Sequence, residues 1–163
     1  MEDVVKIASY IVSRYQKEYG CCMDEMKLHK LLYFTQRESI IQTGSPLFET
    51  AFEAWKYGPV LVEIRRYYKN NLLNVELSAD KIEQYQPVFD KVFQQYASKD
   101  SWSLSTITHG EYSWRNARKG VADAENSSAK IQIDDIRKDA ERIRLRRFIL
   151  RKMKTIDSHN ENN

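Results

Sequence analysis

The chain has 163 residues, of which 42% are hydrophobic and 30% are charged, and its formal net charge is +3. This length and composition predict one globular domain with a buried core, which excludes a disordered or fibrous protein. No stretch approaches 18 apolar residues and the first residues lack a basic start followed by an apolar run, so we expect neither a membrane span nor a signal peptide.

The residues that shape turns and bridges are few. The two cysteines, Cys21 and Cys22, are neighbours, and adjacent cysteines rarely bridge because the geometry is strained. We therefore expect no disulfide framework, no zinc site and a reducing, cytoplasmic compartment. With only 5 Gly and 3 Pro, long helices are favoured over many short strands. The predicted fold is mainly α, a compact single-domain bundle of about six to eight helices with room for one short β-hairpin.

Two amphipathic segments open the chain. Apolar residues spaced by three and four predict a helix over residues 3–19 that Gly20 ends. Asp24 can cap a second helix that stops near Thr43 and Gly44. That second helix is apolar on most sides, which is typical of the buried centre of a small bundle.

Residues 53–60 read EAWKYGPV, and they follow a segment, 47–57, that fits either a short strand or a helical turn. Gly58 can adopt positive φ, and Pro59 suits the first position of a helix over 59–69. Trp55 and Tyr57 can either pack across this joint and fix its angle or form the lip of a binding site. The local physics favours the joint.

The rest of the chain is predicted as shorter elements and one long helix. A segment starts at Ser78 or Asp80, and Pro87 opens a new helix. The remaining elements are short helices at 104–109 and 113–119, a loop at 121–130, a short strand at 131–133, a helix from Asp134 or Asp135 to Lys154, and a disordered tail at 155–163.

The last predicted helix is strongly basic, because residues 134–154 hold nine Lys and Arg and four Asp and Glu. Such a surface could bind phosphates of a nucleic acid or an acidic protein. An apolar stripe of Ile136, Ala140, Ile143, Leu150 and Met153 predicts that the helix packs on the body and turns its cations to solvent.

Catalytic and metal sites are weakly supported. The three histidines, His29, His109 and His159, lack the i, i+4 spacing of a helical metal site, and no Gly-rich phosphate loop is present. The acidic cluster at 134, 135 and 139 is explained by the helix dipole. A catalytic pairing of His109 with Cys22 or Glu111 stays an alternative, but we predict no enzyme and no catalytic, cofactor-binding or metal-binding residue.

Three ordered blocks resemble the Panacea domain of the SocA-like antitoxins, a family also met as phage-associated and prophage proteins. The blocks are MKLHKLLYFTQ at 26–36, GSPLFETAFEAWKYGPV at 44–60 and LSTITHGEYSWRNAR at 104–118. The resemblance spans about residues 4–150, and we place the domain at 1–154. The positions that carry its signature include Lys27, Leu28, Lys30, Leu31, Tyr33, Gly58, Pro59, His109 and Trp114.

The resemblance implies a helical domain without catalysis that neutralises a cognate toxin by direct protein contact. In one branch of the family it also implies an adaptor that delivers the toxin to a ClpXP-type protease. The signature includes no toxin-contact motif, so the predicted contact residues rest on the preference of interfaces for aromatics and arginines. They are Trp55, Tyr57, Arg65, Arg66, Arg144, Arg147 and Arg151. The alternative function is nucleic-acid binding through the basic C-terminal helix.

Overall fold

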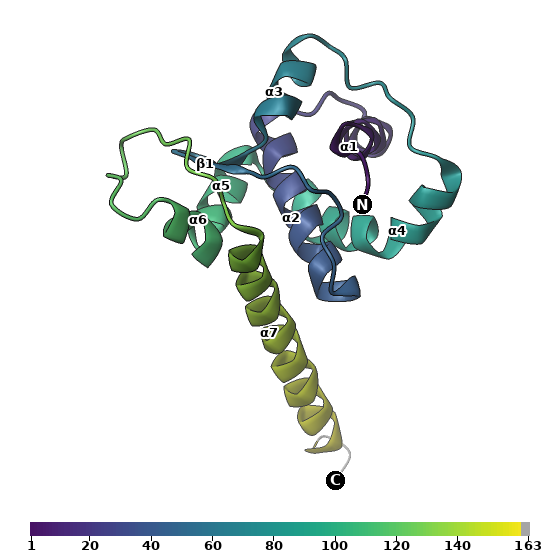
Figure 1. Ribbon diagram of the computed structural model, residues 1–163. Helices are drawn as coiled ribbons and strands as arrows, with labels where there is room; N and C mark the ends of the chain where they lie inside the picture. Colours follow the sequence, from purple (N-terminus) through teal and green to yellow (C-terminus); the bar gives the residue numbers. More distant parts are fainter. Residues whose placement is uncertain (161–163) are drawn as a thin grey trace.

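The computed structural model describes residues 1–160 and confirms the mainly α, single-domain fold with one hairpin (Figure 1). The described part of the chain contains seven α-helices, one π-helical turn and two short strands. In chain order these are α1 (Val4–Tyr19), α2 (Glu25–Thr43), β1 (Glu53–Trp55), β2 (Gly58–Val60), α3 (Val62–Lys69), α4 (Ala79–Val92), η1 (Phe93–Ala97), α5 (Ser101–His109), α6 (Tyr112–Ala117) and α7 (Ile133–Asn160).

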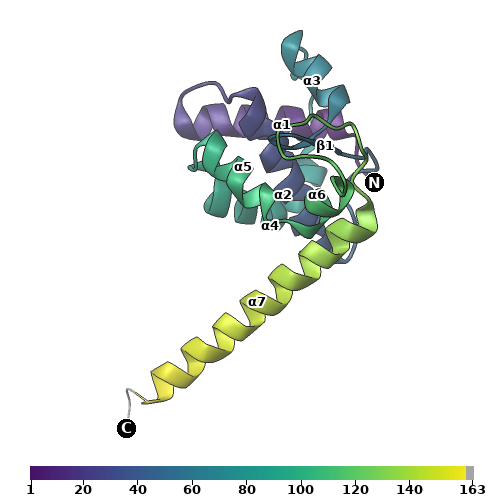
Figure 2. The same ribbon diagram turned by 90° about the vertical axis from the view of Figure 1, so that its left-hand side faces the viewer.

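Helix α2 is the centre of the bundle, as its all-round apolar character predicted. It contacts α1, α3, α4, α5, α7 and β2, and the other elements surround it in Figures 1 and 2. Every residue from Lys27 to Ile40 is buried, including Lys30 and Arg37. The buried polar residues of this helix therefore need partners inside the protein.

The ends of the first two helices agree with the sequence. The Asp3 and Asp24 side chains accept hydrogen bonds from the backbone N–H groups of Val5 and Lys27, at 2.8 Å and 2.9 Å. Gly20 and Gly44 end the two helices with φ of 70° and 76°. In this left-handed conformation a residue with a Cβ is strained, which explains why both stops are glycines.

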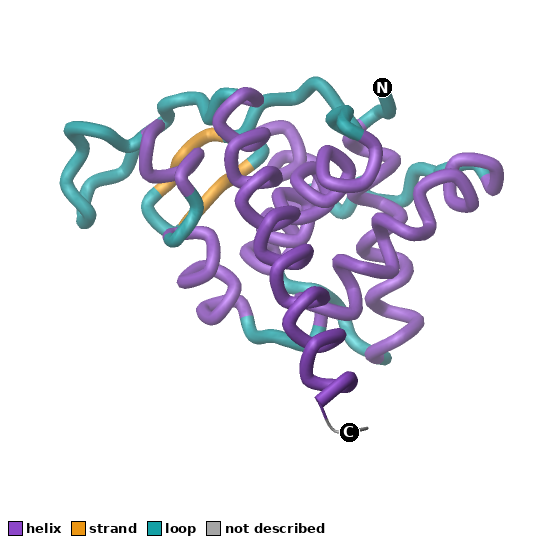
Figure 3. Tube along the Cα trace, turned by 90° about the horizontal axis from the view of Figure 1, so that it is seen from below, coloured by secondary structure: helices purple, strands orange, loops and turns teal. Residues whose placement is uncertain are grey.

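The hairpin corrects the prediction for Pro59. Strands β1 and β2 pair antiparallel, with Ala54 opposite Pro59 and Trp55 opposite Gly58, and helix α3 begins only at Val62. The hairpin lies at one edge of the body beside the long loop that precedes α7 (Figure 3), and Lys130 of that loop forms a bridge with Glu53. The strand predicted at 131–133 does not form: residues 131 and 132 lie between the bridge at Lys130 and helix α7, which begins at Ile133.

The sequence predicted that Pro87 opens a helix, but Pro87 lies inside α4. A proline inside a helix removes one hydrogen bond. Here Pro87 is exposed, while the next two residues, Val88 and Phe89, are buried and fix the helix on the body. Packing therefore outweighs the local signal for a break.

Helix α7 begins in contact with the body and then leaves it (Figure 2). Ile136 and Ala140 are buried and Ile143 is half-buried, but Leu150 and Met153 are 48% and 55% exposed, so the predicted inner stripe is wrong beyond Ile143. The helix continues to Asn160, whereas the sequence predicted its end at Lys154 and a disordered tail. Positions 161–163 of that tail lie outside the described residues.

A buried polar network joins α2 to α6 and α7. Arg37 donates to the Glu111 carboxylate at 2.6 Å and to the Tyr96 hydroxyl at 2.6 Å. Asp139 accepts from the backbone N–H groups of Tyr112 and Ser113, so a residue of α7 caps the start of α6. The Tyr33 hydroxyl lies between these groups, 2.8 Å from Ser113 Oγ and 3.2 Å from both Glu111 and Asp139.

Candidate functional site

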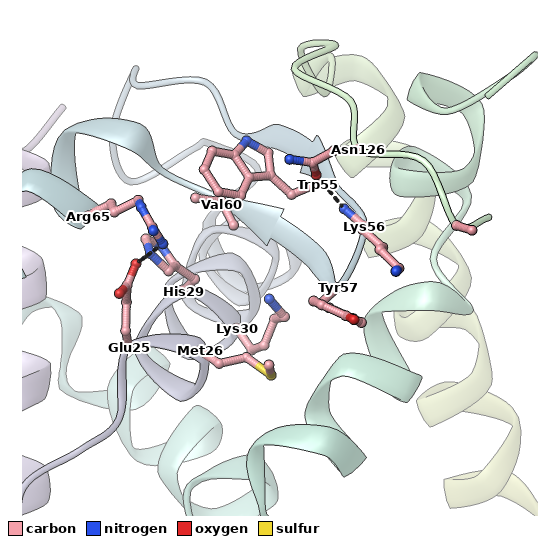
Figure 4. Close-up of a pocket in the computed structure, with 11 residues that line it drawn as sticks. Glu25, Met26, His29, Lys30, Trp55, Lys56, Tyr57, Val60, Arg65 and Asn126 are labelled. Carbon is pink, nitrogen blue, oxygen red and sulfur yellow. Dashed lines mark hydrogen bonds and ion pairs between the residues drawn. The ribbon is translucent and has the colours of Figure 1, made fainter. Parts of the chain in front are cut away.

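A pocket of about 580 Å³ opens between the start of α2, the hairpin, α3 and the loop at 121–130 (Figure 4). Its volume lies within the range of small-ligand sites. The side chains that define its chemistry are Glu25, His29, Lys30, Trp55, Tyr57 and Arg65. We call it the Lys30 pocket.

Lys30 is 1% exposed, and its ammonium nitrogen points toward the middle of the pocket in Figure 4. Its hydrogen bond, to the Pro59 carbonyl, is long at 3.4 Å, and no described carboxylate lies within ion-pair distance. Burial lowers the pKa of Lys30 to about 7. With a pKa near 7, both the charged and the neutral form of this amine are populated near physiological pH.

Gly58 makes room for this lysine. Its φ is 114°, and a Cβ on it would lie 2.6 Å from both Lys30 Cε and Thr108 Oγ1. The lysine stem therefore crosses directly over the glycine at the end of the hairpin turn. The prediction of a positive-φ joint at Gly58 is confirmed, and the close approach of α2 and α5 adds a second reason for glycine.

His29 supplies a second donor on the same helix. Its Nδ1 accepts from the backbone N–H of Leu61 at 3.2 Å, which leaves the proton of the neutral ring on Nε2. Nε2 is buried without a hydrogen-bond partner and lies 3.5 Å from the Glu25 carboxylate. Burial lowers the pKa of His29, so the neutral ring persists at neutral pH.

Aromatic side chains form the opposite wall. Trp55 is half-buried and Tyr57 is 46% exposed, and the Arg65 guanidinium lies 5.3 Å from the Trp55 ring centre. Arg65 also donates to Glu25 at 2.6 Å. The structure thus brings three of the predicted contact residues, Trp55, Tyr57 and Arg65, to one pocket, while Arg66 is exposed on α3.

The base of the hairpin is held by residues of the third sequence block. The Trp114 indole N–H donates to the Trp55 carbonyl at 2.9 Å, and His109 stacks on Trp114 with ring centres 4.2 Å apart. Arg118 donates to the Ala54 carbonyl at 3.0 Å. These contacts fix the wall of the pocket from behind.

The catalytic alternative finds no support in these contacts. Glu111 is bound by Arg37 and Tyr33, and burial raises its pKa although Arg37 opposes that shift. His109 is stacked on Trp114, and Cys22 is exposed in the connection between α1 and α2. Among residues 1–160, no group of three His, Cys, Asp or Glu residues is placed to hold a metal ion. No helix within that range is long and apolar enough to cross a membrane.

The three predicted contact residues of α7 differ in their surroundings. Arg147 forms a bidentate ion pair with the buried Glu38, at 2.9 Å for both contacts, and also donates to Gln95. Arg144 pairs with Glu141 on the surface at 2.7 Å, whereas Arg151 is exposed beyond the body. Arg147 therefore anchors α7 to the body, and its contact with a partner stays a prediction.

Several residues of the pocket escaped prediction. Glu25 and Asn126 belong to segments read as a helix start and a loop, and Lys30 was noted only as a signature position. The Asn126 side chain accepts from the Lys56 backbone N–H at 3.3 Å, which ties the loop to the hairpin turn. Contacts between segments this far apart in sequence leave no local signal.

The comparisons with known proteins agree on one family. A family model described as "Antitoxin SocA-like, Panacea domain" matches residues 28–115, more than half of the chain. A protein named "Antitoxin SocA" from Caulobacter vibrioides (strain NA1000 / CB15N) is 39% identical over 49 residues, which is 30% of this chain and 26% of that relative. The match thus spans about a quarter of the relative's length. No solved structure matches.

Proposed function

Since this chain belongs to the family of SocA-like antitoxins with a Panacea domain, we propose that it neutralises a toxin protein by binding it directly. The family points to a non-enzymatic role. The observation that carries the proposal is the apolar surface on the half of α7 that leaves the body. Delivery of the toxin to a ClpXP-type protease stays a prediction from the resemblance.

Every residue of α7 from Phe148 to His159 is exposed. Five large apolar residues lie on one side of the helix because they are spaced by three, one, four and three positions. We call them the distal stripe: Leu145, Phe148, Ile149, Met153 and Ile156, with exposures of 48% to 61%. Leu145 follows the buried Ile136 by two and a half turns, so the distal stripe faces away from the body.

An exposed apolar stripe of this kind indicates a contact surface. Burying the exposed halves of five such side chains contributes about 4–7 kcal/mol. Association itself costs a similar or larger amount, so additional favourable contacts are needed. The cations beside the stripe can supply them.

The charges select the kind of partner. Residues 142–156 contain seven Lys and Arg and no Asp or Glu, so two copies of this segment would repel each other. The surface fits an acidic partner with an apolar groove. We therefore assign the distal stripe to the toxin.

Two adjacent residues provide a matched test. Ile149 belongs to the stripe and Leu150 does not, yet both are 48% exposed. We expect Ile149→Asp to weaken toxin binding at least about tenfold, and Leu150→Asp to change it less than about twofold. Calorimetry with the cognate toxin, and survival of cells that express both proteins, would measure the effect. Equal loss in both variants, or none in either, would contradict the assignment.

Nucleic-acid binding through α7 is the second candidate. Arg146, Arg151 and Lys154 are exposed and form no ion pair within the described chain. Phosphate binding depends steeply on salt, falling by orders of magnitude between about 50 and 200 mM. Retention of the protein on DNA at about 50 mM salt, with equal retention of the Ile149→Asp variant, would favour this function over the distal-stripe proposal.

A further inference from the structure

The Lys30 pocket has a chemical character that toxin binding through α7 does not use. It holds a buried amine without a carboxylate partner and a buried imidazole N–H whose nearest acceptor, the Glu25 carboxylate, lies at a long 3.5 Å; both groups come from α2. A buried polar group without a good partner is unfavourable, so a ligand that satisfies both groups gains binding energy. Both are donors when Lys30 is protonated, so the complementary group is an acceptor with negative charge.

The balance of charges favours a carboxylate over a phosphate. Glu25 borders the pocket and lies 3.5 Å from His29 Nε2, so it would repel a doubly charged phosphate more strongly than a singly charged carboxylate. Arg65, whose planar group suits phosphate, is already engaged by Glu25. One ammonium and one imidazole N–H match the two oxygens of a single carboxylate.

The wall opposite Lys30 is apolar and aromatic. Trp55 and Tyr57 flank the opening in Figure 4, and Met26 and Val60 complete the apolar lining. The Tyr57 ring is supported from outside by Trp102, with ring centres 5.3 Å apart in an edge-to-face contact. This wall can pack against a ring or a branched aliphatic chain.

We infer that the Lys30 pocket binds a carboxylate carried beside an apolar or aromatic group, with Lys30 Nζ and His29 Nε2 holding the oxygens. The ligand is either a small free acid or a terminal or side-chain carboxylate of a bound protein. The first test uses the chain alone, so its outcome is independent of toxin neutralisation.

The test compares two probes that differ only in charge, N-acetylphenylalanine and N-acetylphenylalanine amide. Nuclear magnetic resonance would follow the indole signal of Trp55, assigned with a Trp55→Phe variant. We expect the acid to shift this signal with a dissociation constant of about 1 mM, and the amide to bind at least about tenfold more weakly. Equal shifts by the two probes, or no shift by either at about 10 mM, would overturn the inference.

Two lysine variants locate the contact. Lys30→Met should abolish the preference for the acid, while Lys99→Met, which removes an exposed cation outside the pocket, should keep it. Binding of the acid should weaken about tenfold per pH unit above pH 7, as Lys30 loses its proton. The other titratable or charged groups around it are Asp24, Glu25 and His29 near the start of α2, Arg65 on α3, Lys56 and Tyr57 in the hairpin turn, and His109 on α5.

Measurements of toxin binding distinguish the two possible sources of the carboxylate. If the toxin supplies it, Lys30→Met weakens toxin binding and the acid probe competes with the toxin. If a free small acid is the ligand, Lys30→Met abolishes probe binding and leaves toxin affinity unchanged. A Lys30→Met variant that binds the acid as tightly as the natural chain would exclude both sources.

Discussion

Replacing Gly58 by alanine should destabilise the protein through two separable effects. The backbone there has φ of 114°, which costs a residue with a Cβ about 1–3 kcal/mol. The new Cβ would also lie 2.6 Å from Thr108 Oγ1, and that hydroxyl is held by a 2.8 Å hydrogen bond to the Ser105 carbonyl. Overpacking of this kind costs about 1–3 kcal/mol, so the expected total is about 2–6 kcal/mol.

Thermal unfolding followed by circular dichroism would measure the loss. For a chain of this size, about 1 kcal/mol lowers Tm by roughly 2–4 °C, so Gly58→Ala should lower it by about 4–24 °C. The matched control is Gly20→Ala, since Gly20 also has positive φ, at 70°, but nothing lies within 4 Å of the Cβ position. It should lose only the backbone cost of about 1–2 kcal/mol.

The comparison isolates the close approach of α2 and α5 to the hairpin. Adding Thr108→Ala to Gly58→Ala should restore part of the loss, with a coupling of about 0.5–3 kcal/mol between the two sites. If Gly58→Ala and Gly20→Ala melt within about 2 °C of each other, the steric argument is wrong.

Three further predictions concern buried charges. Arg37→Met leaves the Glu111 carboxylate without its 2.6 Å partner and should lower the free energy of unfolding by about 3–5 kcal/mol in urea; a loss below about 1 kcal/mol would contradict this role. Burial lowers the pKa of Lys30 from 10.5 to about 7, so the unfolded chain binds the extra proton between these values. The free energy of unfolding of the natural chain relative to Lys30→Met should therefore rise by about 1.4 kcal/mol per pH unit from pH 7 to 9, and this gain is lost as pH falls back to 7. A difference in urea midpoints that does not change with pH would count against it. Asp139→Asn should cost about 2–5 kcal/mol because it weakens the cap of α6, whereas Asp134→Asn, whose side chain is 85% exposed, should cost below about 0.5 kcal/mol, and similar melting curves would refute the distinction.

The sequence predicted the parts of the fold that depend on neighbouring residues. Asp24 as a cap and Gly20 and Gly44 as stops could be read directly, because capping and positive φ involve residues within one turn. The central position of α2 followed from its all-round apolar pattern. Pro59 was misread because its fixed φ suits a helix start and also an extended strand, and only pairing with Ala54 decides between them.

The candidate site was predicted in part. Trp55, Tyr57 and Arg65 were expected at a partner surface and do line one pocket, although binding there stays a proposal. A buried lysine such as Lys30 has the same local sequence signature as an exposed one, since its burial is created by the hairpin that packs over it. Asp139 was read as part of the dipole of its own helix, but it caps another helix 26 residues earlier in the chain.

The prediction of a single inner stripe on α7 was wrong because this helix carries two apolar faces. Ile136 and Ala140 pack on the body, and the distal stripe begins at Leu145 on the opposite side of the same helix. A helix that packed along one body throughout would keep its apolar residues on a single face. The change of face, next to the ion pair between Arg147 and Glu38 that ends the contact with the body, marks where intramolecular packing stops. The residues of the distal stripe are exposed and do not pack on this fold, so we propose that they contact another molecule.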